Sequence, residues 1–207
     1  KFTEEDSPNF FGSSYSIVKG YTDKIMHKYK NTLNLRIRMP IVNEDKPRNF
    51  ITKITKYEKI CSIPNSMSVL PDLIPVMFKM MNDYQTGTIN FTNPGLISHN
   101  EILQMYKDIV DPSFTWNNFS QEEQRKILAA DRSNNYLDTS RLERLYPNVK
   151  NIKDAVLGKI TSGELKMKSK AYFMAKVIVL GFVACLTFLV SVLLVSFTLF
   201  MLRTGGH

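Results

Sequence analysis

Helix-like and strand-like segments alternate along most of the chain, which predicts an α/β fold with parallel strand pairing. Two further observations complete this prediction. A long uncharged segment near the C-terminus is typical of a transmembrane helix, and the strands are too few for a complete doubly wound sheet. At 207 residues, 43% of them hydrophobic, the chain has the length for one domain and an appendage. We therefore expect a partial α/β domain followed by one membrane span.

The first helix is expected to begin at Ser13 or Ser14, either of which can serve as its N-cap. The alternation in LNLRIRMPI predicts a strand from Leu33 to Met39, which Pro40 ends. FITKITKY predicts a short helix and residues 59–63 a short strand. Apolar residues with a period near 3.6 share one side of the first helix: Ile17, Val18, Tyr21, Ile25 and Tyr29.

The later elements are marked mainly by helix starts. DLIPVMFKMMN predicts a helix with Pro75 near its start, and GTINFTNP predicts the strand that follows. Ser98 and Ser120 each stand three residues before a glutamate, and such a capping box begins a helix. SRLERLY and NIKDAVLGKI predict two more short helices, and VDPSFTWNNF, with the single tryptophan, predicts a loop.

The uncharged segment runs from Val177 to Leu202 and is long enough to cross a hydrocarbon core of about 30 Å. Because several lysines precede it and only Arg203 follows, the positive-inside tendency predicts a single-pass C-terminal anchor with the domain in the cytosol. Since the chain starts at Lys1 rather than methionine, an upstream piece is also expected. The expected divisions are a domain at 1–158, a charged linker at 159–170, the membrane helix at 171–203 and a short tail at 204–207.

Composition argues against several classes of function. The net charge of +8 is moderate and shows no basic runs interleaved with aromatic residues, so we expect no nucleic-acid partner. Cys61 and Cys185 form no disulfide framework, which fits a reducing compartment. The three histidines show no ligand spacing, so no metal site is expected.

The segment YSIVK places Tyr15 and Lys19 one helical turn apart. Reduction of a ketone by hydride leaves an alkoxide that needs a proton, and a phenol can supply it if its pKa falls from about 10 toward neutrality. An adjacent ammonium group favours the phenolate. The alternative is that Lys19 forms a surface ion pair with Asp23, also four residues away.

A second tyrosine and lysine with the same spacing occur in YPNVK, from Tyr146 to Lys150. Such a short motif is expected roughly once by chance in a chain of this composition. Pro147 directly follows the tyrosine, and proline begins or interrupts a helix. Only the first copy therefore has the helical setting that the chemistry needs.

Longer strings resemble one enzyme family, the bifunctional 3,5-epimerase/4-reductases that make UDP- or dTDP-rhamnose from a 4-keto-6-deoxy sugar nucleotide. The resemblance covers residues 1 to about 157. It implies the C-terminal half of a Rossmann-type extended short-chain dehydrogenase/reductase domain, similar also to the bacterial dTDP-4-dehydrorhamnose reductases. The strings that carry it are PNFFGSSYSIVK, LRIRMPI, PRNFITKITKY, IPNSMSVL, NFTNPGLISHNEILQMYKD, WNNFSQEEQRKILAADRSNN and NNYLDTSRL.

The resemblance also implies a role for several residues. Tyr15 would protonate the O4 oxygen while NADPH or NADH delivers hydride to C4, and Lys19 would lower the pKa of the tyrosine and hold the nicotinamide ribose. Met39 and Pro40 would lie near the nicotinamide ring. Lys53 would be the epimerase acid, although a solvent-facing lysine is the ordinary alternative.

The expected partner is a UDP- or dTDP-linked 4-keto-6-deoxy sugar, which Arg48 and Asn49 are candidates to contact, and a homodimer is considered as well.

This sequence departs from the family in several features. It lacks the glycine-rich dinucleotide turn, the Ser/Thr that completes the tyrosine–lysine pair and the epimerase cysteine, and its membrane helix has no counterpart in the family. The chain alone is therefore expected to be inactive. Two functions remain open: reduction with 3,5-epimerisation by a more complete protein, or a non-catalytic, membrane-anchored binding or regulatory protein that keeps part of the fold.

Overall fold

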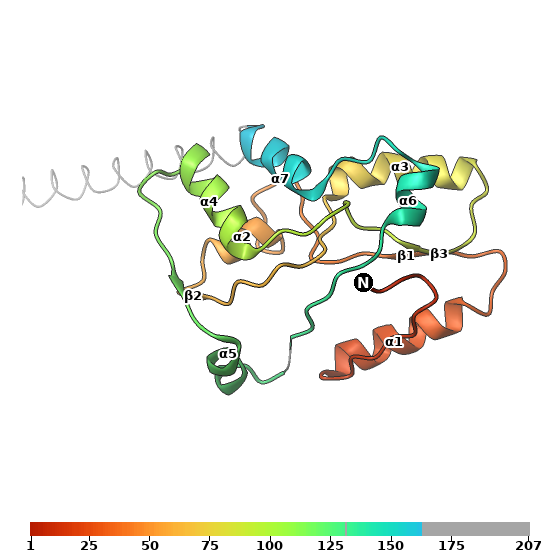
Figure 1. Ribbon diagram of the computed structural model, residues 1–207, viewed down its shortest axis with the longest axis horizontal. Helices are drawn as coiled ribbons and strands as arrows, with labels where there is room; N and C mark the ends of the chain where they lie inside the picture. Colours follow the sequence, from red (N-terminus) through yellow and green to blue (C-terminus); the bar gives the residue numbers. More distant parts are fainter. Residues whose placement is uncertain (131, 163–207) are drawn as a thin grey trace, which may run out of the picture. The chain divides into compact units, whose positions relative to one another are not determined.

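The computed structural model describes residues 1–130 and 132–162 (Figure 1). The expected membrane helix and most of the expected linker lie outside these residues. Within the two described ranges, no helix is both long enough and apolar enough to cross a bilayer. The last described helix continues through Thr161, so the first residues of the expected linker are helical.

The first sheet pairs β1 (Leu33–Arg36) with β3 (Gly87–Asn90) in parallel, with Leu33 opposite Gly87. One face is apolar: Leu33, Leu35 and Ile89 pack in a core with α3 (Leu70–Asn82) and α6 (Ser140–Leu145). The other face is polar and meets α1 (Ser14–Met26), so the sheet lies between α1 and the pair α3 and α6 (Figure 1). Parallel pairing confirms the predicted α/β class.

A second core lies beside a very short parallel sheet, in which Lys59 of β2 is opposite Asn117 of β4. Fully buried Ile51, Ile102 and Val156 bring three helices into one cluster. The elements of this part are α2 (Phe50–Ile54), β2 (Lys59–Ile60), α4 (His99–Ile109), β4 (Asn117–Asn118), α5 (Gln121–Ile127) and α7 (Ile152–Thr161).

Several helices begin where the sequence predicts, because the residues that cap a helix lie only a few positions apart. Both expected capping boxes form: Ser98 accepts a hydrogen bond from the backbone N–H of Glu101, and Ser120 from that of Glu123. The helix with Pro75 begins earlier than expected, at Leu70, because Pro71 occupies its first turn.

The strands are shorter than the sequence predicts. β1 ends at Arg36 rather than Met39, since the backbone of Arg38 turns to Ser68, whose N–H donates to the Arg38 carbonyl at 2.8 Å. β2 likewise ends at Ile60 instead of residue 63. The length of a strand depends on its pairing with a segment distant in sequence. The local alternation of apolar and polar residues carries no information about that partner.

Beyond the ends of the strands, buried polar side chains form the hydrogen bonds to backbone groups. Ser68 and Asn93, both 0% exposed, bind backbone groups of neighbouring segments: the Ser68 hydroxyl donates to the Phe91 carbonyl, and the Asn93 amide oxygen accepts from Val69 N–H, each at 2.8 Å. Such bonds satisfy buried backbone groups that no strand pairs. These side chains therefore hold the loops at the carboxyl ends of β1 and β3.

Candidate active site

Helix α1 carries the candidate tyrosine and lysine. Ser13, one of the two serines expected to cap it, is its N-cap, and it also forms a capping box with Ser16. Tyr15 is 71% exposed, and the Lys19 ammonium lies 5.8 Å from the centre of its ring. The pair therefore shares one helix face and is open to a ligand.

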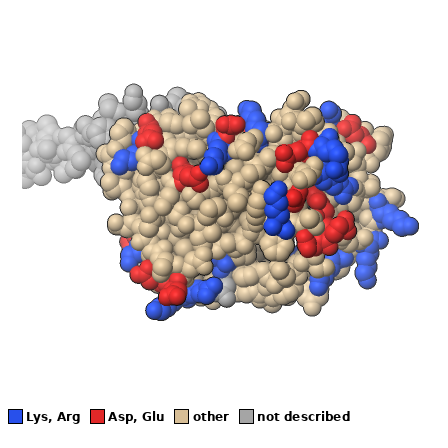
Figure 2. Space-filling view, viewed as in Figure 1, with Lys and Arg blue, Asp and Glu red and all other residues tan. Residues whose placement is uncertain are grey.

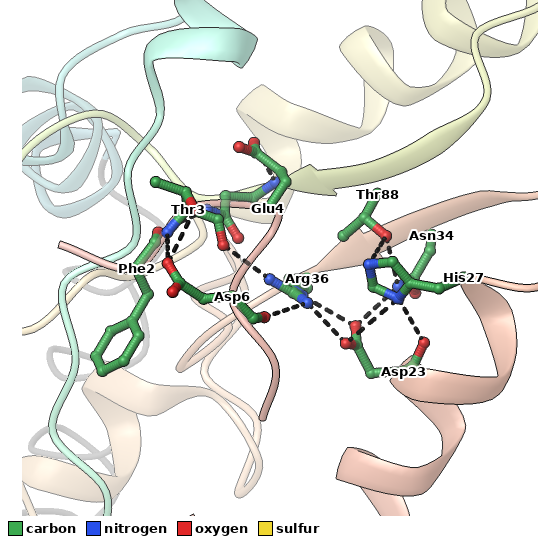
Figure 3. Close-up of polar contacts among 10 residues, drawn as sticks. Phe2, Thr3, Glu4, Asp6, Asp23, His27, Asn34, Arg36 and Thr88 are labelled. Carbon is green, nitrogen blue, oxygen red and sulfur yellow. Dashed lines mark hydrogen bonds and ion pairs between the residues drawn. The ribbon is translucent and has the colours of Figure 1, made fainter. Parts of the chain in front are cut away.

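Asp23, the alternative partner of Lys19, is occupied by another cation. Its carboxylate accepts hydrogen bonds from Arg36 Nη2 at 2.7 Å and Nε at 2.9 Å, and from Asn34 Nδ2 at 2.8 Å (Figure 3). Burial acts to raise the pKa of Asp23, but the hydrogen bonds and charge of Arg36 outweigh it and hold that pKa below its usual value of 3.8. The carboxylate of Asp23 is thus bound by Arg36 rather than by Lys19.

His27 adds a second connection between α1 and the sheet. Its Nδ1 is hydrogen-bonded to the Asp23 carbonyl oxygen at 2.8 Å, and its Nε2 lies 3.1 Å from Thr88 Oγ1 on β3 (Figure 3). Helix α1 is thus fastened to both strands through its polar side.

The N-terminal segment closes around the same arginine. Arg36 donates to the carbonyl oxygens of Thr3 at 3.1 Å and Asp6 at 3.0 Å, and the Glu4 carboxylate accepts from the backbone N–H of Asn90 at 3.0 Å (Figure 3). Residues 2–6 therefore lie against the polar face of the sheet.

Met39 and Pro40, the expected neighbours of the nicotinamide ring, follow β1. Met39 has φ of 39°, although most L residues avoid positive φ and a residue before proline is biased toward extended backbone. A conformation of this kind costs about 1–3 kcal/mol and is often kept at ligand sites. Ile41, which comes next, is fully buried and forms an isolated β-bridge with Val69. The residue that follows the strained turn is therefore held in place.

Arg48, Asn49 and Lys53 lie at α2, on a different element from Tyr15 and Lys19. Arg48 and Lys53 are exposed, whereas Asn49 is 2% exposed. The Asn49 side chain accepts from Val42 N–H and donates to the carbonyls of Val42 and Glu44. It therefore fixes the loop that leads into α2, and a substrate contact by Asn49 stays a prediction.

The competing pair, Tyr146 and Lys150, has no helical register. Tyr146 is the C-cap of α6, is 6% exposed and donates a hydrogen bond to Asp83 at 2.9 Å. Burial and the Asp83 carboxylate raise its pKa to about 12, away from the range that a proton donor needs at neutral pH. The preference for YSIVK over YPNVK agrees with this geometry.

Sequence reasoning missed the two arginines of LRIRMPI. Arg36 binds Asp23, and Arg38 donates to Asn65 and Ser133, each from 2.8 to 2.9 Å, which joins three distant loops. The signal was present, since charged residues at alternate positions of a predicted strand share one face and need partners when they are covered.

The histidine, cysteine and acidic residues within 1–130 and 132–162 form no group of three that could hold a metal ion. Acidic and basic side chains are interspersed at the edges of the face shown in Figure 2, with a broad uncharged area between them.

No family model matches the chain, but individual proteins do. Uncharacterized protein L780 of Acanthamoeba polyphaga mimivirus is 62% identical over 152 residues, which are 73% of this chain and 53% of that protein. A bifunctional dTDP-4-dehydrorhamnose 3,5-epimerase/dTDP-4-dehydrorhamnose reductase of Arabidopsis thaliana is 48% identical over 171 residues, 82% of this chain and 57% of that protein. The chain thus spans about half the length of each of these two relatives.

Comparison with solved structures indicates the same relationship. The crystal structure of the L780 UDP-rhamnose synthase matches with a TM-score of 0.76 and 58% identity over 77% of this chain and 56% of that one. A dTDP-4-dehydrorhamnose reductase from Yersinia enterocolitica, 20% identical, matches with a TM-score of 0.57 over 77% of this chain and 59% of its own, which shows a shared α/β fold. The chain is therefore a homologue of the nucleotide-rhamnose epimerase/reductases, as its longer strings predicted.

Proposed function

We propose that the protein, when completed by a cofactor-binding part, reduces a nucleotide-linked 4-keto-6-deoxy sugar with NADPH or NADH, together with 3,5-epimerisation, in nucleotide-rhamnose synthesis. The observation that carries this proposal is the exposed Tyr15–Lys19 pair on a capped helix, in a chain 62% identical to L780. A nucleotide sugar is the proposed substrate class, by analogy with the dTDP-4-dehydrorhamnose epimerase/reductase and the UDP-rhamnose synthase that the chain resembles.

In this mechanism Tyr15 gives its phenolic proton to the O4 oxygen as the ketone becomes an alcohol. Lys19 would stabilise the phenolate by its charge and would also hold the nicotinamide ribose, because Asp23, the acidic residue on α1, is bound by Arg36. The reduced nicotinamide supplies the hydride when it is bound. Met39 and Pro40 would lie beside the nicotinamide ring.

The described residues fit the nicotinamide end of the cofactor but not its pyrophosphate. Binding a pyrophosphate in this fold needs a glycine-rich turn at a helix N-terminus. Gly87 and Gly95 have positive φ, but Gly87 opens a strand and Gly95 packs beside Asn151. The pyrophosphate site therefore belongs to residues other than those at 1–130 and 132–162.

For the epimerase step, Lys53 is the proposed acid on the exposed side of α2, and Arg48 and Asn49 are proposed to lie by the nucleotide sugar. Ile51 and Ile54, which flank Lys53, are almost fully buried and fix the helix while the lysine reaches outward. Proton removal and return on opposite faces of the sugar require a second group, which this chain must receive from its completing part.

A completed enzyme tests the proposal. This chain can be fused to the part of L780 that it does not match, and oxidation of NADPH by UDP-4-keto-6-deoxyglucose followed at 340 nm. Tyr15→Phe should lower kcat by at least about 100-fold, a typical value of a general acid, with cofactor affinity little changed. Tyr29→Phe, an exposed tyrosine further along the chain, is the matched control.

Undiminished turnover by Tyr15→Phe would show that another group is the acid. A fusion that binds both ligands but shows no turnover would instead favour the second candidate, a non-catalytic, membrane-anchored binding or regulatory protein. The uncharged segment at 177–202 is the observation that favours it.

A further inference from the structure

Ser68 lies between β1 and β3 at the point where the two strands separate. The strands pair as far as Arg36 and Asn90, and the backbone N–H of Phe91 still donates to the Arg36 carbonyl at 2.8 Å. Beyond this point the Ser68 hydroxyl donates to the Phe91 carbonyl at 2.8 Å and accepts from the Arg38 N–H at 3.1 Å. One side chain therefore joins the two strands after their own pairing has ended.

The backbone of Ser68 bonds to both ends of the Met39–Pro40 turn. Its N–H donates to the Arg38 carbonyl at 2.8 Å, directly before the turn. Its carbonyl accepts from the Ile41 N–H at 2.9 Å, directly after the turn. With the bond from the Arg38 N–H to the hydroxyl, every polar group of Ser68 contributes to fixing these two residues.

The turn itself needs such support. Met39 has φ of 39°, and strained backbone of this kind persists only where the surrounding structure determines it. Met39 is half-buried and packs on the core among α2, α4 and α7, whereas Pro40 is exposed and has no N–H to donate. The hydrogen bonds of Ser68 on either side of the turn supply the constraint.

Ser68 acts only through its neighbours, since it is 0% exposed and can touch no ligand. Its own segment is fixed from the β3 side: the Asn93 N–H donates to the Met67 carbonyl at 3.0 Å, and the Asn93 side chain accepts from the Val69 N–H at 2.8 Å. Segment 67–69 is thus a rigid support, and the turn that it holds is the part of this arrangement that reaches the surface.

Ligands of open α/β sheets bind outside the carboxyl ends of the strands, which is where the turn after β1 lies. We propose that Ser68 is a positioning residue for the nicotinamide end of the cofactor, because it holds the Met39–Pro40 turn in its strained shape. The inference rests on the proposed function, which gives this turn its place beside the ring. A looser turn lets the ring move, and a misplacement of about 1 Å can lower a rate on the order of 100-fold.

Hydrogen exchange tests the hold on the turn without any cofactor, in the complete 207-residue chain kept in maltoside detergent. In Ser68→Ala the Arg38 amide loses its acceptor and should exchange about tenfold faster. The decisive amide is that of Ile41, whose acceptor is a backbone carbonyl that alanine keeps. Its exchange should also rise about tenfold, because the turn moves as a unit. An unchanged rate at Ile41 would overturn the inference.

Ser66→Ala is the matched control. Ser66 is also 0% exposed, and its hydroxyl accepts from the Leu137 N–H at 2.9 Å, so the variant loses a buried hydrogen bond of the same kind. Arg38 and Ile41 should exchange in it as in the wild type. Ser68→Thr keeps the hydroxyl and should restore slow exchange. If Ser68→Ala unfolds, Ser68→Cys repeats the test, because a thiol fills the site but forms weak hydrogen bonds.

The fusion with the unmatched part of L780 tests the nicotinamide end itself. The fluorescence lifetime of bound NADPH reports how firmly its ring is held, so it should be shorter in Ser68→Ala than in the wild type or Ser66→Ala. In turnover, kcat should fall by about tenfold or more, while KM for the nucleotide sugar stays within about twofold, because no sugar contact is removed. Ser68→Thr should restore both the lifetime and kcat.

A lifetime and a kcat that Ser68→Ala leaves unchanged, or that Ser66→Ala alters equally, would refute the role of Ser68. Failure of the proposed function gives a different result. A fusion that binds NADPH without turnover refutes the reduction, while the lifetime and the exchange of Ile41 still decide the role of Ser68. A wild-type fusion that does not bind NADPH would overturn both.

Discussion

Arg36 joins three segments that are far apart in sequence: the N-terminal loop through Thr3 and Asp6, helix α1 through Asp23, and its own strand. Its side chain is 16% exposed and that of Asp23 12% exposed, so the pair is largely screened from water. Removing one partner of such a pair leaves the other charge uncompensated, which is far more costly than losing a surface ion pair. The position of Tyr15 and Lys19 therefore depends on a residue outside α1.

The lowered pKa of Asp23 predicts a pH dependence of stability. Because the folded-state pKa lies below the unfolded value of about 3.9, its contribution to folding is present above that value and is lost as pH falls through the folded pKa. At pH 7 Asp23→Asn should lower the free energy of unfolding by about 2 kcal/mol, the worth of a charged hydrogen bond. The difference from wild type should shrink as pH falls below about 4.

Urea denaturation at a series of pH values measures this difference. Asp108→Asn, at an exposed carboxylate bonded to Gln104, is the matched control, and its curves should follow those of the wild type. A gap between wild type and Asp23→Asn that stays constant down to pH 3 would contradict the role given to the charge of Asp23.

At the scale of elements, α7 is fixed by its start. Asn151 caps it by accepting a hydrogen bond from Lys153 N–H, and Ile152 N–H donates to the Pro94 carbonyl at 2.8 Å. Gly95, in the turn that receives α7, has φ of 91°, and a Cβ there would lie 2.9 Å from the Asn151 amide nitrogen. Only glycine adopts this backbone without strain while leaving room for the cap.

Two glycine substitutions should therefore have opposite effects. Gly95→Ala should lower the free energy of unfolding by about 1–3 kcal/mol, from backbone strain and displacement of the cap. Gly158→Ala, within α7 and with open space around its Cβ, should raise it by up to about 1 kcal/mol through helix propensity. Chemical denaturation of both variants gives the comparison. If Gly95→Ala were neutral, the turn would have to tolerate a side chain that this geometry excludes.

Local signals in the sequence predicted the helices well, and long-range pairing limited the rest. Ser13, Ser98 and Ser120 cap helices because a cap needs only residues three positions apart. The strand lengths were overestimated because β1 and β2 end where their pairing with β3 and β4 ends. In the candidate site, spacing placed Tyr15 and Lys19 together. It could not show that Asp23 is bound by Arg36, since that contact comes from another element.

At the scale of the whole molecule, two cores form the described part: one beside the β1–β3 sheet and one among α2, α4 and α7. The α3–α7 ion pair helps to join them, since Asp72 lies 2.6 Å from Lys159 with both side chains largely buried.

We propose in addition that the whole protein is held at a membrane by residues 171–203, with the α/β part in the cytosol. The uncharged segment at 177–202 and the lysines before it support this localisation. Alkaline carbonate extraction of cell membranes should leave the chain in the pellet, and truncation after residue 162 should release it to the supernatant. Extraction of the complete chain into the supernatant would refute a spanning helix.

The polar attachment of α1 has a consequence for the entropy of ligand binding. Because Asp23, His27 and Arg36 already fix the helix, α1 needs no folding or reorientation before a ligand reaches Tyr15 and Lys19. The entropy of ordering α1 is lost when this chain folds rather than during the encounter. Tyr15 and Lys19 are therefore held in a fixed arrangement before any ligand arrives.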